Sequence, residues 1–211
     1  MSRENLMVKV RGQIRNCRRC DGMNEPGKTE SAPGYGSLVS PVVIVGQSLC
    51  NKCMETRIPF TGGSGRYIDQ ALALADREKS EIFTTNLVHC HPVGDEPSKP
   101  EWIKKCKGYL HKELAIIKPI LIVALGEDAQ GDLRLHFPDS EEIPWPFTEP
   151  PKTEPNAETP FLLFPVHPGS LRFKKTADRE YWAPSLGAAI RWAFDTPDLG
   201  HLCGISESES L

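Results

Sequence analysis

Short, continuous apolar runs alternate along the chain with longer segments of helical character. The runs are rich in β-branched residues and lack polar alternation, which is typical of strands buried on both faces of a parallel sheet. They cover residues 41–46, 119–126 and 161–166, and residues 81–86 are a shorter fourth candidate. Helices are predicted at residues 66–74, 100–117, 127–136 and 179–194. This alternation predicts an α/β fold, a three-layer α/β/α sandwich with a central, mainly parallel four-stranded sheet.

Two segments interrupt the pattern. Residues 138–160 are rich in proline and acidic side chains, a composition too polar and broken for a regular element. Residues 195–211 end in Ser-Glu-Ser-Glu-Ser-Leu, which predicts a flexible acidic tail. A chain of 211 residues is long enough for one substantial core. We therefore expect a single domain over residues 1–194, with residues 138–160 as an irregular acidic insert.

Charge and cysteine content restrict the cellular compartment and the kinds of partner that we expect for the protein. The net charge of -3 gives no overall attraction to nucleic acid, so any contact with DNA must come from a local basic patch. No run approaches the roughly 18 apolar residues that span a bilayer, and the N-terminus lacks the apolar stretch of a secretory signal. The odd cysteine count, 7, favours a reducing compartment. We expect a cytoplasmic monomer without membrane contact.

Glycine and polar residues stand at the ends of the predicted strands. Gly46, Gln47 and Ser48 close the first strand, Asn86 ends the second, and His167 follows the fourth. In parallel sheets, ligands bind beyond the carboxyl ends of the strands, where these side chains are expected to meet. The sequence therefore predicts a binding cavity at this edge.

Four cysteines have positions typical of metal ligands. Cys17 and Cys20 form a Cys-x-x-Cys step, Cys90 follows the second predicted strand, and Cys106 lies in the helix predicted at residues 100–117. A close pair of thiolates together with two distant ones can enclose an iron–sulphur cluster. The cysteines thus indicate a site that ties separate segments of the chain together.

A zinc site is the alternative. Cys50 and Cys53 form a second Cys-x-x-Cys step, which with Cys17 and Cys20 would give four zinc ligands. That set leaves the other two cysteines of the proposed cluster site unexplained. We therefore interpret Cys50 and Cys53 as free thiols, and Cys203 has no assigned role.

Three motifs lie in order along the chain. They are Gly46-Gln47-Ser48-Leu49-Cys50 with Pro59-Phe60-Thr61-Gly62 downstream, Thr85-Asn86-Leu87-Val88-His89-Cys90, and His167-Pro168-Gly169-Ser170-Leu171. Together with the four cysteines, over roughly residues 14–194, they resemble the iron–sulphur uracil-DNA glycosylases, family 4 and its relatives. The resemblance implies a monofunctional DNA glycosylase of base excision repair. Such an enzyme flips uracil, or a related deaminated base, out of DNA and hydrolyses its N-glycosidic bond.

The resemblance also implies roles for individual residues. Phe60 would stack on the base, Asn86 would hydrogen-bond to its edge, and His167 would stabilise negative charge on the departing base. The base pocket would be completed by Gly46, Gln47, Ser48 and Cys50, with Gln47 on the water side of the reaction.

Contacts with DNA and with the cofactor follow from the same resemblance. Leu171 would enter the duplex as an apolar wedge. The residues expected to contact DNA are Ser170, Leu171, Arg172 and Lys174. A structural [4Fe–4S] cluster would be held by Cys17, Cys20, Cys90 and Cys106.

The first motif departs from the family pattern. This chain has Gln47 where the family has a glutamate, and Ser48 where cluster-free uracil glycosylases have an aspartate. Without that carboxylate, which orients or activates the water, we expect a rate lowered by about 10²–10⁴-fold. Glu55, close in sequence, is a candidate to replace it. Cys50 stands where cluster-free enzymes have a bulky aromatic, so a base substituted at C5 is expected to be tolerated.

Two alternatives remain open. The missing carboxylate favours a catalytically weak member of the same superfamily that binds damaged DNA without releasing the base. Restored cleavage in Gln47→Glu would identify that cause. A nucleotide or small-ligand binder on the same scaffold is the other alternative, which the wedge-like third motif disfavours.

Overall fold

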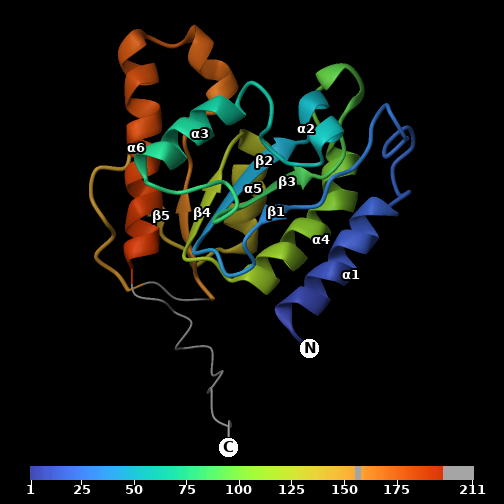
Figure 1. Cartoon of the computed structure of the whole chain (residues 1–211), viewed down its shortest axis with the longest axis horizontal. Helices are drawn as coiled ribbons and strands as arrows, with labels where there is room; N and C mark the ends of the chain where they lie inside the picture. Colours follow the sequence, from blue (N-terminus) through green and yellow to red (C-terminus); the bar gives the residue numbers. More distant parts are fainter. Residues whose placement is uncertain (155–157, 197–211) are drawn as a thin grey trace, which may run out of the picture.

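The predicted strands form the centre of one sheet in the computed structural model, which describes residues 1–154 and 158–196. Parallel and side by side lie β3 (Phe83–Val88), β2 (Val42–Ser48), β4 (Leu121–Ala124) and β6 (Phe161–Leu163). Two-residue strands extend the edges: β1 (Tyr35–Gly36) is antiparallel to β3, and β5 (Glu142–Ile143) is parallel to β6. The sheet in the described residues is therefore 6-stranded instead of four-stranded (Figure 1). Strands this short carry no recognisable hydrophobic pattern.

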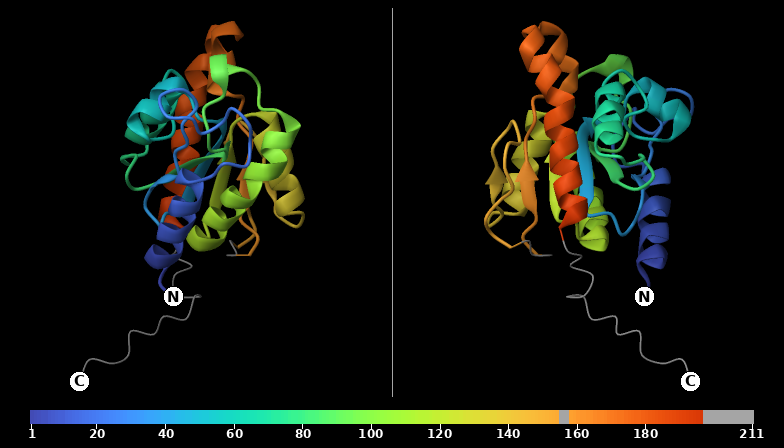
Figure 2. Two further views of the ribbon diagram at one scale, coloured as in Figure 1. Left: turned by 90° about the vertical axis from the view of Figure 1, so that its right-hand side faces the viewer. Right: turned by 60° about the vertical axis from the view of Figure 1, so that its left-hand side comes forward.

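Helices cover both faces of the sheet, which confirms the α/β sandwich class (Figure 1, Figure 2). One face carries α3 (Gly65–Leu74) and α6 (Thr176–Asp195), and the other carries α1 (Arg3–Arg15), α4 (Pro100–Ile117) and α5 (Glu127–His136). Within β2, Val42 and Ile44 join the first core, whereas Val43 and Val45 join the second. A strand buried on both faces needs apolar side chains at every position, which explains its continuous apolar sequence.

Two α-helices of the described residues lie outside the predicted set. α1 packs on α4 through Met7, Val10 and Ile14, which are spaced to share one helix face. The side chain of Ser2 accepts a hydrogen bond from the Asn5 N–H at 3.3 Å and caps this helix. The second helix, α2 (Asn51–Thr56), is only 6 residues long, too short for a periodic pattern.

The acidic, proline-rich segment is partly packed against the core. Within it, β5 joins the sheet, and Ile143 and Phe147 are buried. The Phe147 N–H donates to Ser185 Oγ at 2.7 Å, which fastens the segment to α6. The prediction of an irregular insert is therefore wrong for residues 142–143, which form β5, and the buried side chains of Ile143 and Phe147 join the segment to the core. The predicted tail beyond residue 196, with Cys203, lies outside the described residues.

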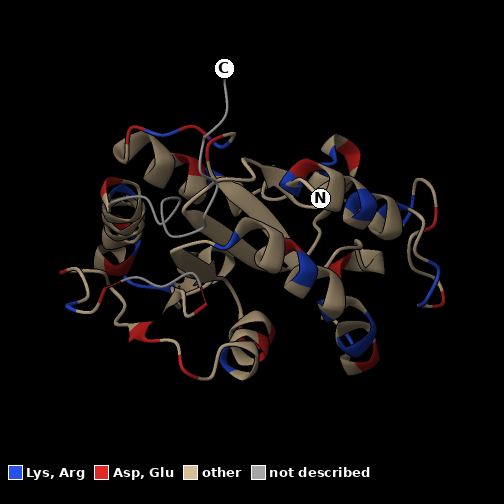
Figure 3. Ribbon diagram, turned by 90° about the horizontal axis from the view of Figure 1, so that it is seen from below, with Lys and Arg blue, Asp and Glu red and all other residues tan. Residues whose placement is uncertain are grey.

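Charged side chains of both signs are interspersed along the helices and loops (Figure 3), as the small net charge of -3 leads one to expect. Over the part of the chain that the structure describes, no helix combines the length and apolar character needed to cross a membrane.

Candidate active site

A cavity of about 700 Å³ lies at the carboxyl edge of the sheet. The residues predicted to bind a base line it together: Gly46, Gln47, Ser48, Cys50, Phe60 and Asn86. His167 and Arg172 join them from the segment that contains the short helix η2 (Pro168–Phe173). The fold thus brings the predicted base-binding residues to one place, and their chemical roles stay predictions.

Gly46 allows the base-binding side chains to pack against β2. A β-carbon at Gly46 would collide with Asn86 Oδ1 and would lie 2.8 Å from Cζ of Phe60. Asn86 is 3% exposed and Phe60 8%, so both side chains are held in fixed positions. Phe60 has a φ of 58°, a left-handed conformation that is costly for an aromatic residue. Its carbonyl accepts a hydrogen bond from Lys79 Nζ at 3.0 Å, which helps to hold this turn.

The protonation of His167 follows from its backbone contact. Its Nδ1 accepts a hydrogen bond from the Gly169 N–H at 3.0 Å, so the ring proton of the neutral imidazole is on Nε2. Burial lowers the pKa of His167 from its ordinary value, which also favours the neutral ring. The indole N–H of Trp182 donates to the Val166 carbonyl at 2.7 Å and fixes the backbone before His167. The ring is therefore prepared to donate one hydrogen bond from Nε2.

Gln47 has a partner that the sequence motifs do not indicate. Its Nε2 donates to Asp128 Oδ2 at 2.7 Å, across 81 residues of chain. Asp128 lies in the first turn of α5, directly after the carboxyl end of β4, and that position is the signal that could have found it. Glu55 is exposed, pairs with Lys52 Nζ at 2.9 Å and is not among the cavity-lining residues. The suggestion that Glu55 replaces the missing carboxylate is therefore wrong.

The segment that follows the third motif exposes a different apolar residue from the one predicted to act as a wedge. Leu171 is 1% exposed and belongs to the core with Trp182, so its side chain is not available as a wedge. Phe173, two residues later, is 77% exposed, and the guanidinium carbon of Arg172 lies 4.6 Å from the centre of its ring. The hydroxyl of Ser170 donates to the carbonyl of His167 at 2.8 Å and supports the turn.

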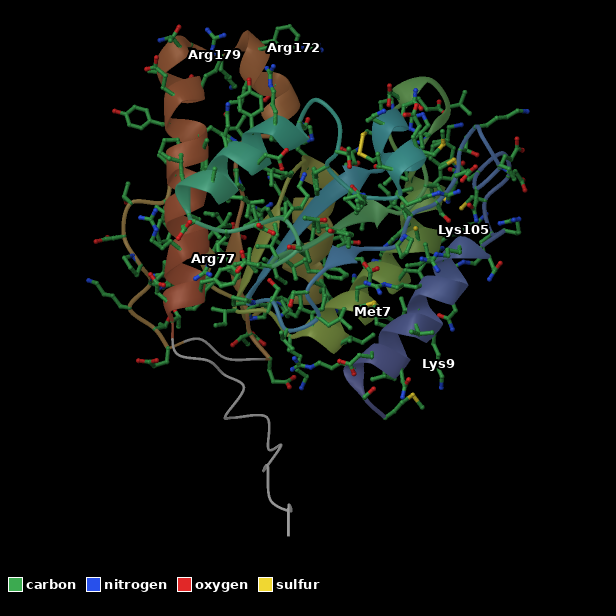
Figure 4. The ribbon with its side chains drawn as sticks, viewed as in Figure 1. Met7, Lys9, Arg77, Lys105, Arg172 and Arg179 are labelled. Atoms are coloured by element: carbon green, nitrogen blue, oxygen red, sulfur yellow. A yellow bond between two sulfur atoms is a disulfide. The ribbon has the colours of Figure 1, made fainter. Side chains whose placement is uncertain are left out.

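Basic side chains flank this exposed ring. Lys174 and Lys175 follow it directly and are exposed. Arg172 and Arg179 lie at the same end of the molecule, above α3 in the view of Figure 4. This end therefore offers an exposed apolar side chain with basic residues next to it, although the overall charge of the chain is negative.

The four candidate cluster ligands line a second, small cavity of about 20 Å³, beside Arg19 and Lys105. They are Cys17, Cys20, Cys90 and Cys106, all free thiols. Burial raises the pKa of Cys90 to about 12, and the neighbouring thiols add to this shift. Burial also opposes ionisation of Cys17, but hydrogen bonds from Tyr109 and Arg19 outweigh it and lower the pKa of that thiol. No group of three or more His, Cys, Asp or Glu side chains in the described residues is arranged to hold a single metal ion.

Cys50 and Cys53 form a disulfide, visible beside α2 in Figure 4. Both interpretations that used them as thiols are therefore wrong: they are neither a free pair nor, with Cys17 and Cys20, a zinc site. The disulfide lies at the wall of the active-site cavity, because both residues line it.

A buried carboxylate connects the cysteine cavity to the strand that carries Asn86. Glu113, fully buried in α4, accepts hydrogen bonds from the Gly34 N–H at 2.9 Å and the Thr85 hydroxyl at 2.5 Å. His89 Nε2 lies 3.2 Å from the same carboxylate. Burial opposes a charge on His89, but Glu113 outweighs it and raises the pKa of His89 to about 10. The backbone N–H of His89 donates to Cys106 Sγ at 3.3 Å, so this network contacts both the cysteine cavity and β3.

The fold and the cavity define an α/β protein with a partly polar cavity at the carboxyl edge of a parallel sheet, the edge at which such folds bind their ligands. Comparison with known families is more specific. The family model of the uracil DNA glycosylase superfamily matches residues 33–184, and the chain belongs to that superfamily.

Individual relatives match part of the chain. The Type-4 uracil-DNA glycosylase of Archaeoglobus fulgidus is 32% identical over 117 residues, which are 56% of this chain and 58% of the relative. The enzyme of the same name from Pyrobaculum aerophilum is 30% identical over 120 residues, 57% of this chain and 60% of the relative. The matches thus span less than two thirds of these relatives. The crystal structure of SMUG2 from Pedobacter heparinus superimposes with a TM-score of 0.49 at 10% identity, covering 90% of this chain and 98% of that one.

Proposed function

We propose that this protein is a DNA glycosylase that removes uracil, or a related deaminated base, from DNA. The observation that carries the proposal is that Phe60, Asn86 and His167 line one cavity in a chain of the uracil DNA glycosylase superfamily. The cavity volume, about 700 Å³, falls within the range of small-molecule sites and suits a nucleobase with its sugar.

The side chains match the chemistry of base removal. A flipped base stacks on the ring of Phe60, and the amide of Asn86 both donates to and accepts from its edge. When the N-glycosidic bond breaks, its electron pair goes to the base, and the neutral His167 donates from Nε2 to the oxygen where negative charge develops. The oxygen of a water molecule bonds to C1′ of the sugar, and the proton that this water loses ends on the released base.

DNA contacts are assigned to the end of the molecule that carries the third motif. Since Leu171 is buried, we assign the wedge to the exposed ring of Phe173. Arg172 and Lys174 then lie on either side of it for contact with phosphates. Phe173→Ala is expected to weaken binding to duplex DNA more than binding to a single strand, and equal losses on both would contradict the wedge assignment.

The direct test of the function uses strand cleavage at abasic sites. The protein is incubated with a duplex that contains one uracil and is then heated in alkali. Breakage at the uracil position, absent from the same duplex with cytosine at that position, is expected. Tight binding without breakage would instead support the alternative of a damage-binding protein that does not release the base.

Gly46→Ala is expected to lower uracil release by about 10²-fold, because the added methyl group displaces Asn86 and Phe60 by about 1 Å. The matched control is Gly131→Ala, since a β-carbon at Gly131, in α5, meets nothing within 4 Å. The measurement is the single-turnover rate of release for both variants. Equal rates for the two would show that the close packing around Gly46 is not needed.

The cysteine cavity fits a structural iron–sulphur cluster by the chemistry of its donors. Thiolates of Cys17, Cys20, Cys90 and Cys106 would hold it, with Arg19 and Lys105 close enough to offset its negative charge. Bound there, the cluster would join the N-terminal segment to β3 and α4, and the hydrolysis itself needs no redox chemistry.

Metal analysis of the purified protein tests this part of the proposal. A brown protein with about four iron and four sulphide per chain is expected for a [4Fe–4S] cluster. Cys106→Ser is expected to lose most of the iron, whereas Cys53→Ser, which removes a disulfide partner outside this cavity, keeps it. A colourless protein with bound zinc and no sulphide would contradict the cluster.

A further inference from the structure

We propose that Asp128 is a positioning residue of the active site, which orients the amide of Gln47 and supplies the negative charge that Gln47 itself lacks. The proposal rests on the proposed function, because it concerns the water side of the same reaction. The two residues come from different elements, Gln47 from the end of β2 and Asp128 from the first turn of α5.

The contact determines which way the Gln47 amide points. An ionised carboxylate only accepts hydrogen bonds, so the Gln47 atom at 2.7 Å from Asp128 Oδ2 must be the NH₂ group. The amide oxygen is then directed away from Asp128.

Gly126 shows where the amide oxygen of Gln47 lies. A β-carbon added at Gly126 would be 3.2 Å from Gln47 Oε1 and 3.9 Å from Cδ2 of His167. The oxygen is thus close to Gly126, which His167 also approaches, and both Gln47 and His167 line the cavity. There it can accept a hydrogen bond from the attacking water, while His167 acts on the base.

Other carboxylates of the described residues are less suited to this task. Asp95 and Glu96 line the mouth of the cavity, but both are exposed, and Glu96 Oε1 lies 3.6 Å from the amine of Lys99. Glu55 is also exposed and pairs with a lysine. Asp128 alone among these acids bonds directly to a residue that the first motif places in the cavity.

This pairing changes the expected result of restoring a carboxylate at position 47. In Gln47→Glu, two carboxylates would stand at hydrogen-bond distance and could not both stay ionised. With one shared proton the pair resembles the natural pair, so the variant is expected to work in mild acid. Its rate should fall as the pH rises and the shared proton is lost. Two other titratable groups lie nearby. One is His167, whose pKa burial lowers from its ordinary value, and the other is the exposed Glu127.

The test is a reciprocal exchange measured by single-turnover release of uracil from a duplex. Asp128→Asn removes the charge and lets the amide turn, so its rate should fall about 10- to 100-fold, with the Kd for the duplex changed less than about threefold. The double variant Gln47→Glu with Asp128→Asn restores one charge and one hydrogen bond. The release rate of this double variant is expected to be within about tenfold of the wild-type rate. It should also lack the pH dependence expected for Gln47→Glu. Glu127→Gln, next to Asp128 on the same turn, is the control and should keep the wild-type rate.

Unfolding midpoints of all variants are measured alongside, so that loss of fold is separated from loss of position. An active wild type combined with an Asp128→Asn rate within twofold of it would overturn the assignment. A double variant that releases uracil no faster than the slower of Gln47→Glu and Asp128→Asn would also overturn the assignment. A wild type that releases no uracil would overturn the proposed function as well, which keeps the two failures distinguishable.

Discussion

His167→Ala is expected to lower the single-turnover rate of uracil release by about 10²–10³-fold, with little change in the Kd for uracil-containing duplex. This is the usual loss when one donor to a developing negative charge is removed. The Gly169 contact at Nδ1 leaves the ring proton of His167 on Nε2. His167→Gln, which keeps an N–H donor, should retain more activity than His167→Ala. Equal loss in binding and in rate would show that the residue serves binding alone.

The same residue gives the rate its pH dependence. Because burial lowers the pKa of His167, the ring stays neutral below its ordinary value of 6.5, and the rate should fall only under still more acidic conditions. At a pH between the lowered pKa of the folded protein and the ordinary pKa of 6.5, His167 binds a proton in the unfolded chain and does not in the folded protein. The contribution of His167 to stability is therefore present above about pH 6.5 and is lost as the pH falls. A pH–rate profile of wild type and His167→Gln checks this, since the acidic decrease should be absent from the variant.

Glu113→Ala is expected to cost about 3–5 kcal/mol of folding free energy, as when one partner of a buried ion pair is removed. The change leaves the Gly34 N–H, the Thr85 hydroxyl and the buried His89 without their acceptor. For a chain of this size, the thermal midpoint should fall by about 10 °C.

An exposed glutamate on another helix provides the comparison for Glu113. Glu180→Ala, on α6, is expected to change stability by less than about 0.5 kcal/mol. Calorimetry of the two variants checks the difference. A loss below about 1 kcal/mol in Glu113→Ala would mean that the network of Glu113 contributes little to the fold.

The sequence predicts the framework of this protein because its signals there are local. The bounds of α4 and α5 agree with the predicted helices at residues 100–117 and 127–136, and three of the central strands, β2, β4 and β6, coincide with continuous apolar runs. The apolar spacing of Met7, Val10 and Ile14 was available for α1 as well. The two-residue edge strands depend on neighbours that only the folded sheet provides.

The candidate site is predicted less completely, for a physical reason. A strand-end motif gives the position of a residue such as Asn86, but it says nothing about contacts between distant side chains. The contact of Gln47 with Asp128 joins positions 81 residues apart, so no local pattern contains it. An apolar residue in a loop likewise does not reveal whether it faces the core, as Leu171 does, or the solvent, as Phe173 does.

Release of the free base is the most direct measurement of the central claim, that the cavity between Phe60, Asn86 and His167 removes uracil from DNA. A duplex with one uracil is incubated with the protein, and free uracil and abasic sites are quantified over time. We predict one uracil released for each abasic site formed, and a release slowed in His167→Ala. A duplex that is bound by the protein while its uracil stays attached would contradict the account.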